Sequence, residues 1–147
     1  MLDRDPVPAR LGATLDAARS GFDLCLIDTP PAAPAWLREA VGHADLVLIP
    51  VRPSPDDLRA VGATIAAVSD AGCSFAFVLS QTPRARITEE AARVLAQHGR
   101  VAPVNLAQRV SYAIAGATGQ GVSETGDAKA AAEVSDLWAY VKGLLDG

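Results

Sequence analysis

Cysteine is scarce in this sequence, with only Cys25 and Cys73 among 147 residues. Two thiols are too few for the disulfide framework of a small secreted domain. Each lies inside an apolar, strand-like run, which favours buried free thiols in a reducing cytosol. A disulfide between the two is the less favoured alternative.

Long apolar runs and an excess of positive charge are missing as well. No apolar run approaches the ~20 residues of a membrane span, and the first residues, Met1–Pro6, lack the apolar core of a signal peptide. We therefore expect a cytoplasmic location and no membrane segment. The net charge of -4 argues against nucleic-acid binding through bulk charge, although it leaves room for a local basic face.

The composition is that of a globular domain, because half of the residues are hydrophobic and 20% are charged. A chain of 147 residues can bury a sizeable core within one domain. No internal repeat and no shift in composition marks a second domain. We therefore interpret residues 1–147 as a single domain.

Apolar runs of strand length alternate with segments of helical periodicity. The predicted strands lie near residues 22–28, 45–51, 74–79 and 101–106. The predicted helices lie near residues 9–19, 34–42, 55–71, 88–98, 110–117 and 134–145. This alternation predicts an α/β fold with a mostly parallel, doubly wound sheet and helices on both faces.

The stretch Phe22–Ile27 is the run around which we expect the fold to be organised. Five of its six residues are apolar, which is typical of a strand buried on both faces of a parallel sheet. Asp28 would then stand at the carboxyl end of that strand, where open α/β sheets bind ligands. The alternative is that Asp28 only caps a turn.

The last predicted helix carries one apolar stripe, which we expect to pack on the sheet, with Trp138 in the core. The stripe consists of Val134, Leu137, Trp138, Val141, Leu144 and Leu145.

Three features together resemble a known family. They are a strand ending Leu-Ile-Asp-Thr-Pro-Pro at 26–31, a strand ending Leu-Ile-Pro-Val at 48–51 with a proline-rich helix start, and the run 109–124 before an alanine-rich helix. In their order and spacing they resemble the ParA/MinD-type partition ATPases, the deviant Walker-A branch of the P-loop NTPases. The resemblance covers nearly the whole chain from about Leu2 onward.

This resemblance implies catalytic and cofactor roles near the first strand. Thr29 and Pro30 belong to the stretch that matches the Walker B region, and Asp28 would hold the magnesium ion of bound ATP, usually through water. Asp3 resembles the first aspartate of the family's Asp-x-Asp-Pro segment, near the attacking water and the metal. A pair of solvated turn aspartates, Asp3 and Asp5, is the alternative.

The resemblance also implies contacts to the base, to DNA and to a partner protein. Ser80 and Gln81 follow the strand after which relatives place a residue that reads adenine, and Asn105 lies where relatives close over the base. Relatives use basic residues in this half of the chain for sequence-independent DNA binding through phosphates, and they act with a ParB-like adaptor. The candidates for DNA contact are Arg84, Arg86 and Arg109; solvated surface arginines are the alternative.

The family's glycine- and lysine-containing phosphate loop is absent from the sequence. The one glycine-rich run, Gly116–Gly121, contains no lysine, so nothing supplies the oriented donors that phosphates need. We expect either an N-terminally truncated ATPase or a natural relative that cannot hydrolyse ATP alone. We also expect either self-association through an open strand edge or direct pairing of the strand at 22–28 with residues 46–51. The remaining alternatives are a non-catalytic binding or regulatory relative and a receiver-type signalling domain with Asp28 as phosphoacceptor.

Overall fold

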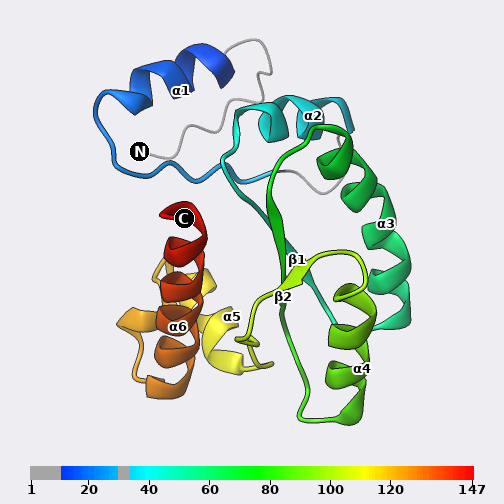
Figure 1. Ribbon diagram of the computed structural model, residues 1–147. Helices are drawn as coiled ribbons and strands as arrows, with labels where there is room; N and C mark the ends of the chain where they lie inside the picture. The colour runs from blue at the N-terminus through cyan, green and yellow to red at the C-terminus, as the bar shows by residue number, and fades with distance from the viewer. Residues whose placement is uncertain (1–10, 30–33) are drawn as a thin grey trace.

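The computed structural model describes residues 11–29 and 34–147. Helices and strands alternate from α2 onward (Figure 1). The chain is therefore an α/β protein, as the sequence pattern predicts. Its elements are α1 (Leu11–Arg19), α2 (Pro34–His43), β1 (Val47–Val51), α3 (Pro55–Asp70), β2 (Phe75–Leu79), α4 (Arg86–Leu95), β3 (Arg100–Val101), α5 (Val110–Thr118), the short 3-10 helix η2 (Val122–Glu124) and α6 (Ala128–Leu145).

Three parallel strands form the sheet, in the order β1-β2-β3. β1 pairs with β2 in a register that sets Val47 opposite Phe75. The predicted strands at 45–51 and 74–79 are thus confirmed, and so is their parallel arrangement. β2 is the central strand because it alone has a neighbour on each side.

The predicted strand at 101–106 is much shorter in the structure, where β3 covers only Arg100–Val101. Pro103 has no N–H to donate, which ends regular pairing. The chain nevertheless continues beside β2, because the Leu106 amide donates to the Leu79 carbonyl at 2.9 Å. This irregular stretch reaches the carboxyl edge of the sheet.

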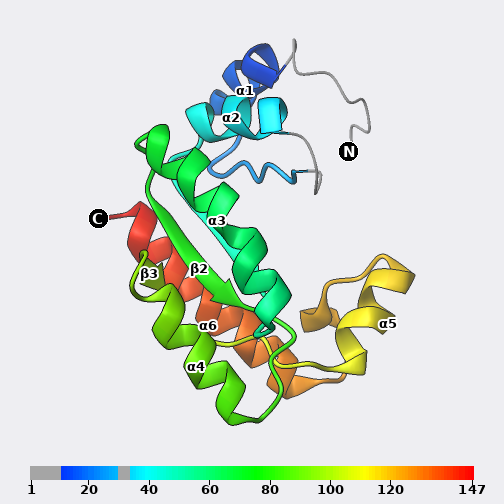
Figure 2. The same ribbon diagram turned by 90° about the vertical axis from the view of Figure 1, so that its right-hand side faces the viewer.

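Helices cover both faces of the sheet, with α3 and α4 on one face and α6 on the other (Figures 1 and 2). Successive side chains of β2 point to opposite faces. Phe77 and Leu79 are fully buried toward α3 and α4, while Ala76 and Val78 are buried on the other face. Phe77 and Leu79 pack in a core cluster with Ile49, Val51, Val61, Ala91 and Leu95.

The start of α3 follows the local sequence closely. Ser54 is the N-cap, and its hydroxyl oxygen accepts a hydrogen bond from the Asp57 amide at 3.2 Å. Pro55 occupies the first turn, where its missing N–H costs nothing. This predicted cap is confirmed, and it fixes where the chain turns after β1.

The predicted strand at 22–28 is wrong, because the structure has no strand there. The segment is irregular, and Phe22 and Leu26 are 74% and 84% exposed. A strand needs a neighbour to pair its N–H and C=O groups, and β1 is not paired with this segment in the sheet. The predicted burial of Cys25 is wrong for the same reason: its thiol is exposed, whereas Cys73 is half-buried.

The predicted core position of Trp138 on α6 is also wrong, since this side chain is 46% exposed. Val141 on the same stripe is buried, but Leu145 is 38% exposed. The carboxyl-terminal half of α6 borders an open cavity rather than a closed core, which leaves part of its apolar stripe uncovered. Within the described residues, none of the helices has the length and apolar character needed to cross a membrane.

Candidate functional site

A cavity of about 330 Å³ opens where β1 and β2 end. The carboxyl edge of a parallel sheet is where open α/β folds bind ligands, and this volume lies at the small end of ligand pockets. The cavity is lined by Arg52, Pro53, Ser54, Asp56, Asp57, Gln81, Pro83 and Gln108. All these residues follow a strand or lie in the loop that runs beside β2.

Gln81 has a backbone conformation that is rare for a residue with a side chain. Its φ of 50° lies in the left-handed region, a conformation that costs on the order of 1–3 kcal/mol and persists only where the surroundings enforce it. Hydrogen bonds on both sides do so: the Ser80 amide donates to the Val51 carbonyl at 3.0 Å, and the Thr82 amide donates to the Leu106 carbonyl at 3.1 Å. Such enforced strain clusters at functional sites.

Charges on one wall of the cavity compensate each other. Arg52 Nε lies 3.0 Å from an Asp57 carboxylate oxygen, and the Ser54 hydroxyl donates to the same carboxylate. The Ser54 hydrogen bond, followed by that of Arg52, holds the pKa of Asp57 below its ordinary value. Asp57 thus stays ionised beside Arg52, and the wall carries no free positive charge for an anion.

The amino terminus of α3 at this wall is already occupied by its own acidic residues. Asp56 and Asp57 stand in its first turn, where they satisfy the positive end of the helix dipole. Phosphate would meet two carboxylates there. Gln81 and Gln108, in contrast, supply amide groups that can both donate and accept. The cavity therefore suits a flat polar group with donors and acceptors better than a phosphate.

The structure brings the predicted base-contacting residues to this same edge. Ser80 and Gln81 directly follow β2, and Asn105 precedes Leu106, whose amide bonds to the last carbonyl of β2. Gln81 lines the cavity; Ser80 is half-buried and Asn105 is exposed. Sequence reasoning missed Arg52 and Gln108. The position of Arg52 after a predicted strand was a usable signal for it, whereas nothing in the sequence marked Gln108.

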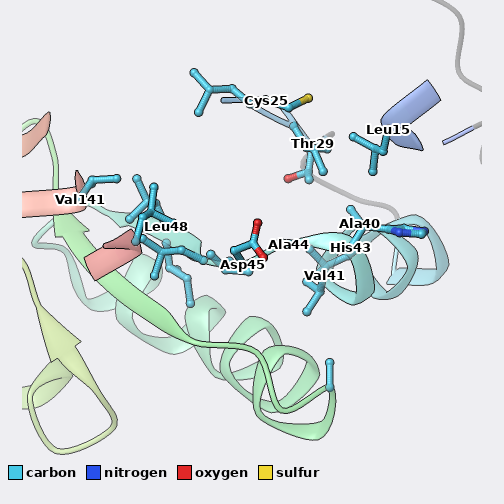
Figure 3. Close-up of a pocket in the computed structure, with 18 of the residues that line it drawn as sticks. Leu15, Cys25, Thr29, Ala40, Val41, His43, Ala44, Asp45, Leu48 and Val141 are labelled. Atoms are coloured by element: carbon cyan, nitrogen blue, oxygen red, sulfur yellow. The ribbon is translucent and has the colours of Figure 1, made fainter. Parts of the chain in front are cut away.

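The predicted metal and Walker B residues lie elsewhere. Thr29 borders a second, larger cavity together with Ala44 and Asp45, which precede β1 at the amino end of the sheet (Figure 3). The expected place of Asp28 at a carboxyl strand edge is wrong, because Asp28 is exposed in the irregular segment. Asp3 and Pro30 lie outside the described residues.

The described residues contain no cluster of metal-ligating side chains. Among them, no three His, Cys, Asp or Glu side chains gather closely enough to hold a metal ion. The predicted base and metal residues stay apart in this arrangement.

The three candidate arginines have different surroundings. Arg84 is exposed, and Arg86 is exposed but paired with Glu90 at 2.9 Å. Arg109 is only 20% exposed and forms a bidentate pair with Glu133. Its charge is thereby compensated within the fold, which leaves Arg84 as the candidate with the freest charge.

Glu133 on α6 is the centre of a network that sequence reasoning missed. Besides Arg109, its carboxylate accepts hydrogen bonds from the Tyr112 hydroxyl and the Ala107 amide, both at 3.1 Å. The Arg109 hydrogen bond holds the pKa of Glu133 below its ordinary value, and burial, followed by Glu133, raises the pKa of Tyr112 to about 12. These hydrogen bonds attach the loop that contains Asn105 and Ala107 to α6.

A scan against protein-family models gave no match to the chain, and a search of curated proteins gave none.

Proposed function

We propose that this chain is a ParA-like, P-loop NTPase-related domain of the DNA-partition type, and that it binds an adenine nucleotide through its base. The observation that carries the proposal is the cavity at the carboxyl ends of β1 and β2, lined by the strained Gln81 and by Gln108. Gln81 follows β2, the strand after which the sequence resemblance expects base recognition. By that resemblance the full activity would be ATP-dependent segregation of plasmid or chromosomal DNA.

Recognition in the proposed mode is by hydrogen bonding to a neutral ring. The amides of Gln81 and Gln108 can each pair with one donor and one acceptor on the edge of a purine. The carboxylates of Asp56 and Asp57 direct the phosphates away from this wall, toward solvent. Base and ribose thus supply most of the affinity.

Hydrolysis is not part of the proposed activity of this chain. Its sequence has no phosphate loop with lysine, and phosphoryl transfer depends on positioning and charge neutralisation. No three metal-ligating side chains gather among the described residues, and the proposal includes no metal-dependent step. The activity that we propose for this chain is therefore nucleotide binding.

Calorimetry with adenosine, AMP and ATP tests the proposal. We expect adenosine and AMP to bind with similar affinity, with or without magnesium, since the base carries the contact. Gln81→Ala should weaken binding by about 2–10-fold, the value of one hydrogen bond. Gln97→Ala, at an exposed glutamine after α4, is the matched control. Absence of adenosine binding, or equal binding by both variants, would refute the proposed site.

Contact with DNA is a second part of the proposal, and it now depends on Arg84. This side chain is exposed two residues from Thr82, whose carbonyl accepts from the Gln108 amide at 3.1 Å. It therefore stands close to the carboxyl edge. We expect weak duplex binding that falls with salt, and a smaller salt dependence for Arg84→Ala than for the control Arg59→Ala on α3. Identical salt dependence for the two variants would remove Arg84 from a DNA surface.

A further inference from the structure

β1 has one free edge. It is the first strand in the sheet order, and its backbone pairs with β2 through alternate residues: the Val47 amide donates to Ser74, and the Val51 carbonyl accepts from Ser80. The residues in between, Leu48 and Pro50, therefore direct their backbone groups away from β2. Pro50 offers only a carbonyl, so the free edge presents one N–H and two carbonyls to an added strand.

A large cavity lies alongside this edge (Figure 3). Its volume of about 1690 Å³ exceeds the ~300–1,000 Å³ of small-molecule pockets, so it has room for a polypeptide segment. The side chains of Leu48, Trp138 and Leu145 line it and are 37%, 46% and 38% exposed. This wall is apolar and uncovered.

The same chain also carries an exposed apolar segment that belongs to none of the three strands. Phe22, Leu24 and Leu26 are 74%, 44% and 84% exposed, and all three border the same cavity. Of the ten large hydrophobic side chains that the described residues expose, six border this cavity. Apolar exposure concentrated in this way marks a surface that another polypeptide covers.

In its own copy, the segment does not pair with the free edge, although both border the same cavity. It leaves α1 through a turn in which the Gly21 and Phe22 amides both donate to the Ala18 carbonyl at 3.0 Å. It then runs across the molecule below α1 and α2 in the view of Figure 1. The segment thus leaves the free edge of β1 open, and its own exposed apolar side chains are available to a second copy.

We propose that two copies of this chain form a dimer in which residues 22–27 of each add as a strand to the free edge of β1 in the other. Six extended residues span roughly 20 Å, enough to cover the five residues of β1. Main-chain hydrogen bonds supply affinity, and the apolar side chains enter the cavity of the other copy. A twofold axis makes both contacts equivalent, so each copy's free edge and apolar segment are covered at once.

Sedimentation velocity over a range of concentrations tests the dimer. We expect the unmodified chain to dimerise reversibly and Leu26→Asp to weaken the dimer by at least about tenfold, because a carboxylate would enter an apolar cavity. The control is Val110→Asp, at a residue with similar exposure, 73%, outside the cavity. It should dimerise like the unmodified chain. A chain that is monomeric at every concentration, or equal dimerisation of the two variants, would overturn the proposal.

Disulfide trapping identifies the segment that occupies the edge. In a Cys73→Ser background, Leu48→Cys or Pro50→Cys, whichever lies opposite residue 25, should form an intermolecular disulfide with the native Cys25, since paired strands bring Cα atoms within disulfide reach. Val94→Cys, exposed on α4, should not form one with Cys25. An intramolecular link from residue 25 to residue 48 or 50 would show that the segment closes on its own chain, and it would overturn the proposed exchange.

Discussion

Two apolar stretches of this chain are alike in composition and opposite in burial. In β2, Phe77 and Leu79 have no exposed surface, whereas in 22–27 Phe22 and Leu26 are 74% and 84% exposed. β2 has a strand on each side and helices over both faces, while 22–27 has no strand beside it in the sheet. Burial of a strand-like run is thus decided by its neighbours, which its own sequence does not contain.

The largest expected effect compares the two phenylalanines directly. Phe77→Ala should lower the free energy of unfolding by about 3–5 kcal/mol, because it leaves a cavity in the closed core. Phe22→Ala should change it by less than about 0.5 kcal/mol, as exposed substitutions usually do. Urea unfolding of both variants, at a concentration where the chain is monomeric, measures the difference. Equal losses would show that 22–27 is buried in the monomer.

The sequence predicted the elements that depend on local signals. The strand at 74–79 and the Ser54 cap were found because hydrophobic patterning and capping chemistry act over a few residues. The strand at 22–28 and the core position of Trp138 were wrong, because both required a neighbouring element that the structure does not provide.

The candidate site also contains residues that local sequence signals predicted and residues that they did not. Gln81 could be placed at the carboxyl edge because it follows a correctly predicted strand. Its left-handed φ, by contrast, comes from long-range hydrogen bonds to Val51 and Leu106 on either side of it. Asp28 was misplaced together with its strand. The role of Glu133 depends on a loop 24 residues away in sequence, and no local pattern indicates such a partner.

Two acid-to-amide substitutions, one in the packed part of the fold and one in the exposed segment, test the same contrast for polar side chains. Glu133→Gln should lower the free energy of unfolding by about 1–3 kcal/mol at neutral pH, because it weakens the bonds of Arg109 and Tyr112 at a half-buried site. Asp28→Asn, in the open segment, should have almost no effect. Chemical denaturation of both variants gives the two values; a loss for Asp28→Asn as large as that for Glu133→Gln would contradict the contrast.

The pH dependence of the Glu133 network has a defined sign. The pKa of Glu133 is lowered in the fold from its ordinary 4.5, so the folded chain binds a proton there less readily than the unfolded chain. The stabilisation of the fold by ionised Glu133 is fully present above pH 4.5 and is lost as the pH falls through the folded pKa. As the pH is lowered from about 6, the free energy of unfolding should therefore decrease more steeply for the unmodified chain than for Glu133→Gln. Parallel curves would show that the carboxylate is not bonded in solution.

The smallest expected effect concerns the strain at Gln81, and it has the opposite sign. Glycine adopts a φ of 50° without the penalty that a side chain brings, although it loses more entropy on folding. Gln81→Gly should therefore raise the free energy of unfolding by about 0.5–1 kcal/mol. Gln97→Gly is the control: φ is not positive at Gln97, so glycine there should destabilise.

The same Gln81→Gly variant should bind adenosine more weakly, because the amide that faces the cavity is gone. A gain in stability together with a loss of binding would show that the carboxyl edge keeps a strained residue for its ligand. A loss of stability in Gln81→Gly, measured by thermal melting against Gln97→Gly, would show instead that the Gln81 side chain supports the fold.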